Sequence, residues 1–350
     1  MVFSFHQPVR SPYLRTAIVG VSGFAGLTAL RLLENHPVFS VTTVCAGSQA
    51  GQALHAIWPH LAGIADLTNV VVKPSTGDVL EGHDVVFLAT PHDVAAQLAG
   101  PLVNQGALVV DLSGGHRLSG AGMIEWYGLT HPHSELLPAI YGLPELVDLR
   151  EARLIAGPRC YPTATVLGLA PFLDVIDLAS ISTVGLSGLS GAGRLATEPF
   201  SFVAANENTR VYGSPGHRHT PEIERILGEL SQRTQPPIRF TPHVVPQTAG
   251  LVATSTADLI APVDPLQQLR DYYADQPFIT VTPSWPETGA VVGSNRAMVH
   301  AQVDTRANSL IVSCAIDNTI KGASGQGIQA ANAALGLDQT LGLPRVGTYL

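Results

Sequence analysis

The stretch LRTAIVGVSGFAG, residues 14 to 26, decides how this chain folds. Its first six residues predict a short β-strand, the glycines Gly20, Gly23 and Gly26 follow at once, and a helix pattern continues to Leu33. Strand, glycine loop and helix in this order suit a dinucleotide, because glycines let the backbone approach a pyrophosphate and the helix amino end faces its negative charge. The spacing is G-x-x-G-x-x-G, so a plain tight turn is the alternative from these residues alone.

A second predicted strand, residues 39 to 45, indicates which dinucleotide binds. NAD enzymes usually place Asp or Glu just after this strand, on the ribose hydroxyls. Here the chain carries Ala46, Gly47, Ser48 and Gln49 instead. With no carboxylate to repel a 2′-phosphate, the sequence favours NADP(H) as the cofactor.

Three further apolar runs predict strands: residues 70–72, 85–89 and 108–111. Their alternation with helical stretches such as 93–103 predicts a Rossmann-type, doubly wound parallel sheet. Ligands bind at the carboxyl ends of the strands in such sheets. Pro91 and Ser113 follow two of these ends, and Arg117 lies in the next glycine-flanked loop, where its planar guanidinium would grip a phosphate. A solvated arginine is the alternative for Arg117.

The second decisive stretch is AGPRCYPT, residues 156 to 163. A predicted strand enters its Gly-Pro turn, and a helix-compatible run, residues 164–173, follows the cysteine. The thiol of Cys160 therefore lies near a helix amino end, where the helix dipole favours thiolate, and the neighbouring Arg159 acts in the same direction. Cys160 is the candidate nucleophile, and a buried structural cysteine is the alternative.

The chain changes character after Cys160, where longer strands predominate: residues 181–186, 238–245, 251–259, 298–304 and 310–316. They predict a second domain on a mixed, largely antiparallel sheet, whose free face invites dimerisation. We expect an NADP-binding domain over residues 1–159, completed by a C-terminal helix over residues 322–350. The catalytic and dimerisation domain would then span residues 160–321.

The motif HRHTPE, residues 217 to 222, supplies the candidate acid and base. Thr220 suits the N-cap position of the helix that follows. The positive helix end then keeps His219 neutral, as a base at pH 7 should be, with Glu222 in the first turn to orient it. His217 is the other candidate proton carrier, and a satisfied loop residue is the alternative for a single histidine here.

Two glycine-containing loops complete the predicted cofactor cleft. SGLSGAGR, residues 187–194, is small enough for a nicotinamide ring or a substrate to approach its backbone, and AIDNTIKGASGQ, residues 315–326, ends a strand and returns polar side chains to the cleft. The predicted cofactor contacts are Gly20, Ser22, Gly23, Phe24, Ala25, Gly26, Ser48, Pro91, Ser190, Gly191 and Asn318.

Composition restricts the remaining functions. The 350 residues are 45% hydrophobic and 13% charged, which suits two folded domains, and the net charge of −8 argues against a nucleic-acid surface. No apolar run is long enough for a membrane span and the segment from Met1 to Arg15 lacks the apolar centre of a signal peptide, so we expect a cytoplasmic protein. Three scattered cysteines, and histidines without paired spacing, predict neither a disulfide framework nor a metal site.

Taken together, these motifs resemble the N-acetyl-gamma-glutamyl-phosphate reductase family, which is related to aspartate-semialdehyde dehydrogenases. Besides the glycine loop, the matching segments are Pro91-His92, YGLPE at 141–145, CYPT at 160–163, SGAGR at 190–194, HRHTPE at 217–222, GSN at 293–295 and AIDN at 315–318. The family usually has Gly where Arg159 stands, and an Ala-Asp-Phe-like sequence where residues 114–116 are Gly-Gly-His.

This resemblance implies an NADPH-dependent oxidoreductase of arginine biosynthesis, a homodimer or homotetramer, that converts N-acetyl-L-glutamyl 5-phosphate into N-acetyl-L-glutamate 5-semialdehyde and phosphate. It implies a thioacyl intermediate on Cys160 and proton transfer by His219 or His217. The substrate contacts that we expect are Arg117 on the phosphate, Arg194 on the carboxylate, and Ser113.

Several alternatives stay open at this point. An aspartate-semialdehyde dehydrogenase or an N-acetyl-aminoadipyl-phosphate reductase would share the mechanism and differ in how the substrate tail is bound. A thiol acyltransferase or hydrolase would need no nicotinamide, so cofactor titration separates it from the others. A catalytically silent NADP-binding regulator is disfavoured by the presence of Cys160 and His219.

Overall fold

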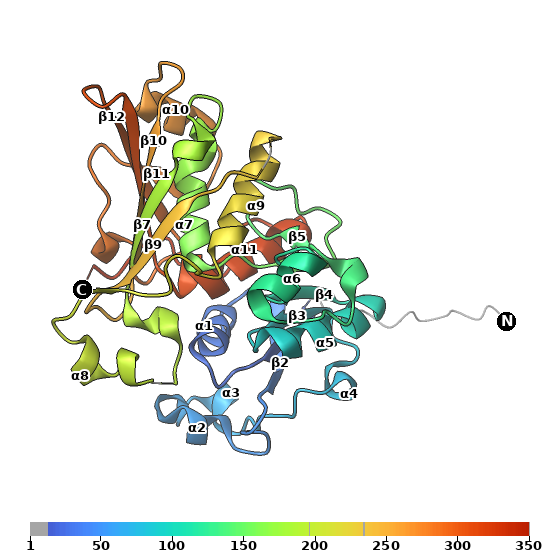
Figure 1. The fold of residues 1–350 in the computed structure, drawn as a ribbon. Helices are drawn as coiled ribbons and strands as arrows, with labels where there is room; N and C mark the ends of the chain where they lie inside the picture. The colour runs from blue at the N-terminus through green and yellow to red at the C-terminus, as the bar shows by residue number, and fades with distance from the viewer. Residues whose placement is uncertain (1–12, 196, 234, 350) are drawn as a thin grey trace.

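Two β-sheets form the framework of the protein, as the computed structural model shows (Figure 1). The structure describes residues 13–195, 197–233 and 235–349. The first sheet is built from the chain before Cys160, and the second from the chain after it. The nucleophile candidate therefore stands at the passage from one sheet to the other.

The first sheet has six parallel strands in the order β2-β1-β3-β4-β6-β5. They are β1 (Leu14–Val19), β2 (Phe39–Cys45), β3 (Val85–Leu88), β4 (Leu108–Asp111), β5 (Ile140–Tyr141) and β6 (Leu154–Ala156). The order changes direction between β1 and β3, and the carboxyl ends of strands beside such a switch point form the ligand-binding crevice of doubly wound sheets. The predicted doubly wound parallel sheet is confirmed.

One predicted strand of this sheet is wrong. Residues 70–72 form no strand: Val71 makes an isolated bridge with Ala53, and Lys73 makes one with Cys45. The chain crosses the end of β2 here instead of running beside it. Pro74 then stops further pairing, because proline has no N–H to donate.

Helices cover both faces of the first sheet. Its helices are α1 (Phe24–Leu33), α2 (Leu54–Ile57), α3 (Ala65–Thr68), α4 (Gly77–Leu80), α5 (His92–Asn104) and α6 (Gly120–Tyr127). Phe87 of β3 packs in the core shared with α1, whereas its neighbours Val86 and Leu88 pack in the core shared with α5. Because successive strand residues point to opposite faces, α1 and α5 lie on opposite sides of the sheet.

The last helix returns to this first sheet. A π-helical turn, η8 (Ile320–Ser324), leads into α11 (Gly325–Ala334), which packs against α1 and β4 (Figure 1). The C-terminal helix predicted over residues 322–350 is therefore too long, because α11 ends at Ala334 and the turn at Gly336 follows. The hydroxyl of Ser324 donates a 2.7 Å hydrogen bond to the carbonyl of Ala25 in the glycine loop. The end of the chain thus supports the loop at its start.

The second sheet is mixed, with the order β11-β12-β13-β10-β7-β9-β8. Its strands are β7 (Ser182–Ser187), β8 (Arg210–Val211), β9 (Arg239–Val244), β10 (Leu251–Asp258), β11 (Ile279–Val281), β12 (Ala297–Asp304) and β13 (Ser309–Ile316). Four of its six strand pairs are antiparallel. The predicted mixed, largely antiparallel sheet is confirmed.

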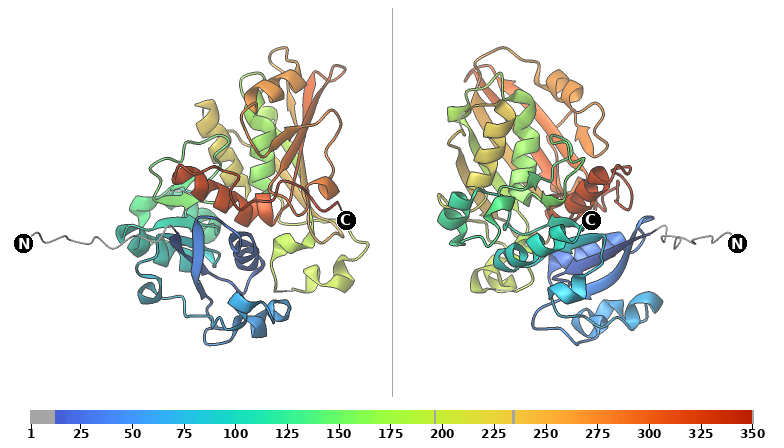
Figure 2. Two further views of the ribbon diagram at one scale, coloured as in Figure 1. Left: turned by 180° about the vertical axis from the view of Figure 1, so that it is seen from behind. Right: turned by 90° about the vertical axis from the view of Figure 1, so that its right-hand side faces the viewer.

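One face of the second sheet is covered by helices. The remaining helices are α7 (Cys160–Leu169), α8 (Phe202–Ala205), α9 (Thr220–Ser231) and α10 (Pro265–Tyr272). Every residue of α7 is buried, and it packs on β10 and β13 (Figures 1 and 2). Gly185 of β7 allows this close approach, because a Cβ there would lie 2.4 Å from the Tyr161 ring. Buried and partly exposed residues alternate along β10, so the opposite face of the sheet is less covered.

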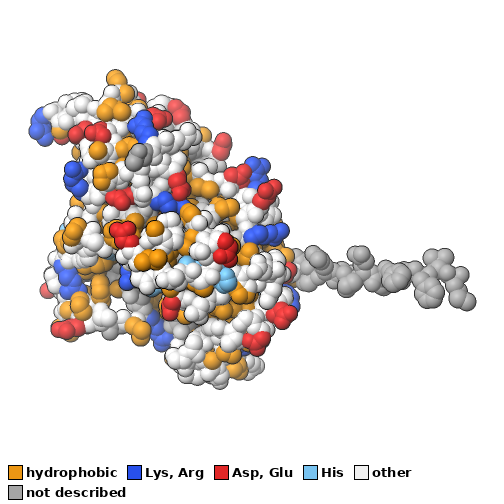
Figure 3. Space-filling view, turned by 45° about the vertical axis from the view of Figure 1, so that its right-hand side comes forward, with side chains coloured by type: hydrophobic (Ala, Val, Ile, Leu, Met, Phe, Trp, Pro, Cys, Tyr) orange, Lys and Arg blue, Asp and Glu red, His pale blue; other side chains and the backbone are white. Residues whose placement is uncertain are grey.

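The surface carries charges of both signs. On the face shown in Figure 3, Lys and Arg side chains are dispersed among acidic and apolar ones and form no continuous basic patch. No helix among the described residues is long and apolar enough to cross a membrane.

Candidate active site

Cys160 is the first residue of α7, immediately after a turn that follows β6. The N–H of Gly157 donates to the carbonyl of Asp111 at 2.8 Å, which fixes this turn beside the end of β4. Arg159 occupies the N-cap position and makes no side-chain cap. Cys160 lies at a helix amino end, as predicted, and the structure also places it after the carboxyl end of β6.

The thiol of Cys160 experiences opposing influences. Burial raises its pKa, whereas the charge of Arg159 and a hydrogen bond from the Tyr161 backbone lower it. Burial is the largest of these, so the pKa lies above the ordinary value in the ligand-free site. Arg159 thus acts in the predicted direction, and burial, which the sequence did not predict, opposes it.

A cavity of about 210 Å³ lies between the glycine loop and the thiol. Gly23, Phe24 and Ala25 line it from the first sheet, and Cys160 lines it from α7. Ser190, Gly191 and Asn318 close the far side, where the Asn318 amide donates to the Ser190 hydroxyl at 2.9 Å. Two loops distant in sequence thus meet the glycine loop, as the sequence predicts.

The glycine loop fits a pyrophosphate. Gly23 caps α1 without any side-chain hydrogen bond, so no side chain occupies the N–H groups of the first turn. Gly20 has a φ of +95°, and a Cβ there would lie 2.2 Å from the carbonyl oxygen of Ala89, which follows β3. This position therefore requires glycine for packing, while Gly23 is open toward the cavity.

Not every predicted cofactor contact lines this cavity. Ser22 contributes its carbonyl oxygen to a hydrogen bond with Arg194, and Gly26 packs against Gly20. Ser48 is exposed in the loop after β2, away from the cavity lining. Pro91 is the N-cap of α5 and lines a second cavity.

Arg194 is fixed above the glycine loop. Its guanidinium donates to the carbonyls of Ser22 at 3.0 Å and Ile57 at 3.2 Å, and it lies 4.0 Å from the centroid of the Trp58 ring. It also lines the 210 Å³ cavity. The structure therefore places Arg194 beside the cofactor loop and outside the histidine cavity described next.

A second cavity, of about 410 Å³, contains both histidines of the HRHTPE motif. Tyr127, Arg159 and Arg218 line it together with His217 and His219. Thr90 and Arg159 are the two residues that line both cavities. Within the described residues no hydrogen bond joins His219 to Cys160, and Arg159 lies between their two cavities.

Both histidines are held in the neutral state. Burial, followed by the charges of Arg159 and Arg218, lowers the pKa of His217 to about 4. Burial also lowers the pKa of His219 well below its ordinary value, with His217 and Arg159 contributing next. The Nδ1 atom of His217 accepts a 3.2 Å hydrogen bond from the His219 N–H, which requires that nitrogen to carry no proton.

Glu222 does not orient His219, which corrects the prediction. Its carboxylate is 1% exposed and accepts a 2.9 Å hydrogen bond from the Tyr141 hydroxyl and a 3.2 Å hydrogen bond from the Arg159 N–H. The helix α9 starts at Thr220, so His219 itself is the N-cap, and the side chain of Glu222 points toward the nucleophile turn. Glu222 therefore supports the backbone next to Cys160.

Arg117 and Ser113 are also placed differently from the prediction. Arg117 is 1% exposed and donates to the carbonyls of Gly157 and Leu112, with Glu222 3.5 Å away. Ser113 is 2% exposed and accepts a hydrogen bond from Gly115. Neither lines either cavity. The structure gives both residues a structural role in place of the predicted substrate contacts.

Sequence reasoning missed two residues that line the histidine cavity and one that packs against its histidines. Arg218 and Tyr127 line the histidine cavity, where the Arg218 guanidinium lies 5.3 Å from the Tyr127 ring centroid. Tyr161 packs against both histidine rings, with centroid distances of 6.0 and 5.8 Å. The motifs HRHTPE and CYPT contained Arg218 and Tyr161, whereas Tyr127 lies in α6 and carried no signal.

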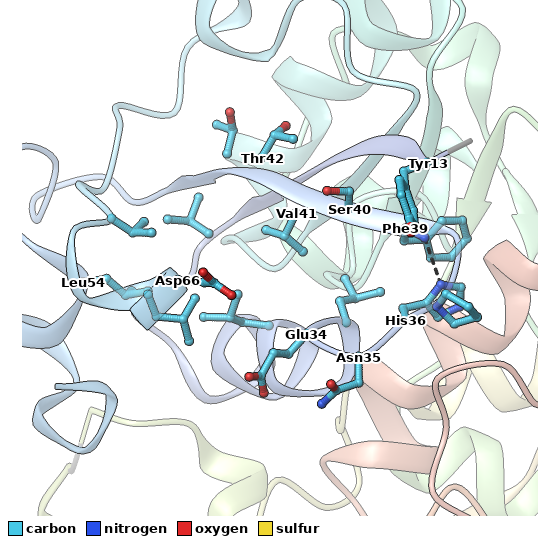
Figure 4. A pocket seen from close by; sticks show the side chains of 17 residues that line it. Tyr13, Glu34, Asn35, His36, Phe39, Ser40, Val41, Thr42, Leu54 and Asp66 are labelled. Carbon is cyan, nitrogen blue, oxygen red and sulfur yellow. Dashed lines mark hydrogen bonds between the residues drawn. The ribbon is translucent and has the colours of Figure 1, made fainter. Parts of the chain in front are cut away.

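A further cavity, larger than these two, lies elsewhere in the first domain. A hollow of about 480 Å³ lies between β2, α1 and α3, where His36 stacks on Phe39 (Figure 4). The N–H of Phe39 donates to His36 Nδ1 at 2.9 Å. Neither Cys160 nor the HRHTPE motif lines this hollow, so it is not the candidate active site. The described residues contain no cluster of His, Cys, Asp and Glu suited to a metal ion.

Comparison with known proteins defines the class and then the family. Residues 15–152 match the semialdehyde dehydrogenase NAD binding domain, and residues 160–318 match the semialdehyde dehydrogenase dimerisation domain, so the chain is of the semialdehyde dehydrogenase class. Proteins named N-acetyl-gamma-glutamyl-phosphate reductase from Moorella thermoacetica and Geobacter sp. strain M21 are 38% and 42% identical, each over 94% of this chain and 98% of the relative. The chain therefore belongs to the N-acetyl-gamma-glutamyl-phosphate reductase family, as its motifs predict.

Solved structures show the same fold. Aspartate semialdehyde dehydrogenase II from Vibrio cholerae superposes with a TM-score of 0.71 at 16% identity, over 93% of this chain and 99% of that one. The Candida albicans enzyme, solved with NADP, gives a TM-score of 0.65 at 19% identity, over 92% of this chain and 98% of that one. At this identity the likeness concerns the fold alone.

Proposed function

We propose that this protein catalyses the NADPH-dependent reduction of N-acetyl-L-glutamyl 5-phosphate to N-acetyl-L-glutamate 5-semialdehyde and phosphate, a step of arginine biosynthesis. The observation that carries the proposal is the position of Cys160, which faces one cavity together with the glycine loop. The family relatives, 37–42% identical over nearly the whole chain, support the choice of substrate.

Cys160 acts as the nucleophile. Its thiolate attacks the acyl phosphate carbonyl, a carbon–sulfur bond forms, and the carbon–oxygen bond to phosphate breaks with its electron pair leaving on the phosphate. The thioacyl enzyme that remains divides one difficult reduction into two easier steps. The Arg159 charge and the Tyr161 backbone N–H favour the thiolate against the effect of burial.

His219 or His217 moves the proton. NADPH bound in the cavity beside the glycine loop would supply a hydride to the thioester carbonyl. The neutral histidine accepts the thiol proton as the thiolate forms and returns it to the oxyanion that hydride addition creates. It then takes the hydroxyl proton back as the carbon–sulfur bond breaks, with the electron pair leaving on sulfur, and the semialdehyde is released. Such a positioned acid and base contributes typically ~10²–10⁴-fold. Arg159, which precedes Cys160, lines the same cavity as both histidines, and this supports a role for them in the same reaction.

The glycine loop, Ser190, Gly191 and Asn318 hold the cofactor. Exposed Ser48 lies in the loop after β2, beside a backbone bridge to Lys73, and that loop contains no carboxylate. This composition supports NADP(H) over NAD(H), because a ribose carboxylate partner would repel the 2′-phosphate.

We propose the domain division made from the sequence, with the NADP-binding domain ending at residue 159 and regaining the C-terminal segment. The packing of α11 on α1 supports it. A homodimer or homotetramer is proposed because residues 160–318 match a dimerisation domain. The cytoplasm is the proposed location, which three free buried cysteines support, since thiols persist in a reducing compartment.

The rival substrates differ in their tails. Aspartate semialdehyde enzymes share the fold with this chain at 16–19% identity, which does not favour their substrate. The aminoadipyl homologue has one more methylene than the acetylated glutamyl substrate, a change worth only about 1–3 kcal/mol in a pocket. We therefore rank N-acetyl-glutamyl phosphate first.

The test is the reverse reaction. Wild-type protein should reduce NADP⁺ in the presence of phosphate and N-acetyl-glutamate semialdehyde, and Cys160→Ser should reduce the rate by at least ~10³-fold, because the thioester cannot form. Cys45→Ser is the matched control, since that buried thiol lines neither cavity, and it should keep the wild-type rate. Aspartate semialdehyde and the aminoadipyl homologue are run in parallel. Faster turnover with either rival, or no loss in Cys160→Ser, would overturn the proposal.

A further inference from the structure

Both cavities are built for anions. Arg159 and Arg194 line the cavity beside the glycine loop, and Arg159 and Arg218 line the histidine cavity. No Asp or Glu is among the described residues that line either one. A ligand with two separate negative charges, such as an acyl phosphate with a carboxylate at the other end, matches this arrangement.

The guanidinium of Arg159 lies where it is available to a ligand, because Arg159 lines both cavities. Its backbone N–H and carbonyl are hydrogen-bonded, but its side chain makes no hydrogen bond or ion pair within the described residues. The Arg159 side chain is exposed to solvent and lines both cavities, so an anion can reach its guanidinium. Desolvation, and next the charge of Arg117 nearby, lower the pKa of Arg159, and an anion bound at this guanidinium would act in the opposite direction.

The other three arginines near the site are placed differently from Arg159. Arg117 donates to two carbonyls, faces Glu222 and lines no cavity. Arg194 holds two carbonyls of the first domain, over the Trp58 ring. Arg218 lines only the cavity that lacks Cys160, whereas Arg159 is bonded to the nucleophile residue and lines both cavities.

We propose that the Arg159 guanidinium binds the phosphoryl group of the substrate, in the role that the sequence analysis gave to Arg117. This inference rests on the proposed function. When the Cys160 thiolate attacks the carbonyl, the phosphoryl oxygen gains the electron pair of the breaking bond, and Arg159 stabilises that charge as phosphate leaves. In the reverse direction Arg159 holds inorganic phosphate for attack on the thioester, with a carbon–oxygen bond formed and the carbon–sulfur bond broken.

The first test measures the KM for phosphate in the reverse reaction. Arg159→Gln should raise it by about 10- to 100-fold, the effect of losing a charge-assisted hydrogen bond, while the KM for NADP⁺ changes less than threefold. Arg159→Lys should fall in between, because it keeps the charge and loses the planar fork. Arg218→Gln is the matched control: it removes the same charge from the same cavity and should change the phosphate KM less than threefold.

The second test needs no turnover. Inorganic phosphate bound by Arg159 should slow the alkylation of Cys160 by iodoacetamide, and this protection should be lost in Arg159→Gln. The ratio of rates with and without phosphate is compared within each variant, so a change in thiol pKa does not enter. Because the Arg159 side chain has no partner to lose, Arg159→Gln should keep the wild-type melting temperature.

The outcomes separate the two proposals. If the wild type does not turn over any of the semialdehydes, the proposed function fails, and the protection assay still decides whether Arg159 binds phosphate. If the wild type turns over and Arg159→Gln keeps both the phosphate KM and the protection ratio within twofold, the inference is overturned alone. Equal increases in the phosphate KM for Arg159→Gln and Arg218→Gln would also overturn it, because the effect would then be one of general cavity charge.

Discussion

At the scale of single residues, Glu222 connects more of the site than any residue that faces the cavities. Its buried carboxylate accepts hydrogen bonds from Tyr141 and from the Arg159 N–H, and Arg117 lies 3.5 Å away. Tyr141 comes from β5 and Arg117 from the loop after β4, so one carboxylate of α9 joins both sheets. The turn that presents Cys160 therefore depends on a charge that never meets the substrate.

The Glu222→Gln variant tests this role. The amide keeps the shape and can still accept from Tyr141, but it leaves Arg117 buried without its counter-charge, which costs about 3–5 kcal/mol. We expect the free energy of unfolding, measured in urea, to fall by that amount. The control is Glu229→Gln in the same helix: Glu229 is 55% exposed and pairs with the less exposed Arg225 at 3.0 Å, and its loss should cost no more than about 1 kcal/mol. Equal effects of the two changes would contradict the buried connection.

The elements differ in how far the sequence could predict them. The bounds predicted for β1, β2 and β4 agree with the structure, because each is an apolar run bounded by a turn. The run at residues 70–72 has the same composition and failed, because a strand also needs a neighbour in register, and Val71 meets only one residue of the chain. β5 and β11, two and three residues long, are too short to leave a periodic pattern.

The same holds for the site: the sequence predicts features that depend on neighbouring residues, and it does not predict contacts between distant ones. Local sequence predicted that Cys160 lies near a helix amino end and that His219 adjoins another, since both follow from the residues around them. It failed for Glu222, Arg117 and Ser113, because their partners lie on other elements. An arginine can bind a ligand only if its guanidinium is not already hydrogen-bonded to protein carbonyls. One of the carbonyls that Arg117 contacts belongs to Gly157, forty residues away, so the sequence near Arg117 does not reveal this contact.

At the scale of elements, the glycine loop has two kinds of glycine. A Cβ at Gly20 would lie 2.2 Å from the Ala89 carbonyl oxygen, and its φ of +95° strains any other residue. A Cβ at Gly23 would approach protein no closer than 3.6 Å, but it would enter the cofactor cavity.

Alanine substitutions test this difference between the two glycines. We expect Gly20→Ala to lower both the melting temperature and NADPH affinity. We expect Gly23→Ala to lower NADPH affinity at least ~10-fold with little change in melting temperature. Thermal unfolding and NADPH fluorescence titration measure the two; a melting temperature unchanged in Gly20→Ala would refute the packing argument.

At the scale of the whole molecule, the second sheet leaves one face without helices. Thr183 and Gly185 of β7 point to the helix side, where Thr183 bonds Ser255 and Gly185 adjoins Tyr161. Val184 between them therefore points to the other side, and its side chain is 42% exposed. Its neighbour in register on β10 is Thr254, also partly exposed, so the face carries β-branched residues without charge at this point. A face of this kind is suited to packing against a second copy of itself.

If that face forms the proposed homo-oligomer contact, a charge at its centre should separate the subunits. Val184→Arg would bring two like charges together across a two-fold axis and leave both desolvated, so we expect a smaller assembly than the wild type in sedimentation analysis at equal concentration. Ile124→Arg is the matched control, because Ile124 is 57% exposed on α6, away from this sheet, and should leave the sedimentation unchanged. A wild type that sediments as a monomer would remove the oligomer from the proposal. If the Val184→Arg assembly keeps the wild-type mass, the subunit contact lies on another surface. The exposed residues Phe202 and Val203 of α8 would then be the next positions to substitute.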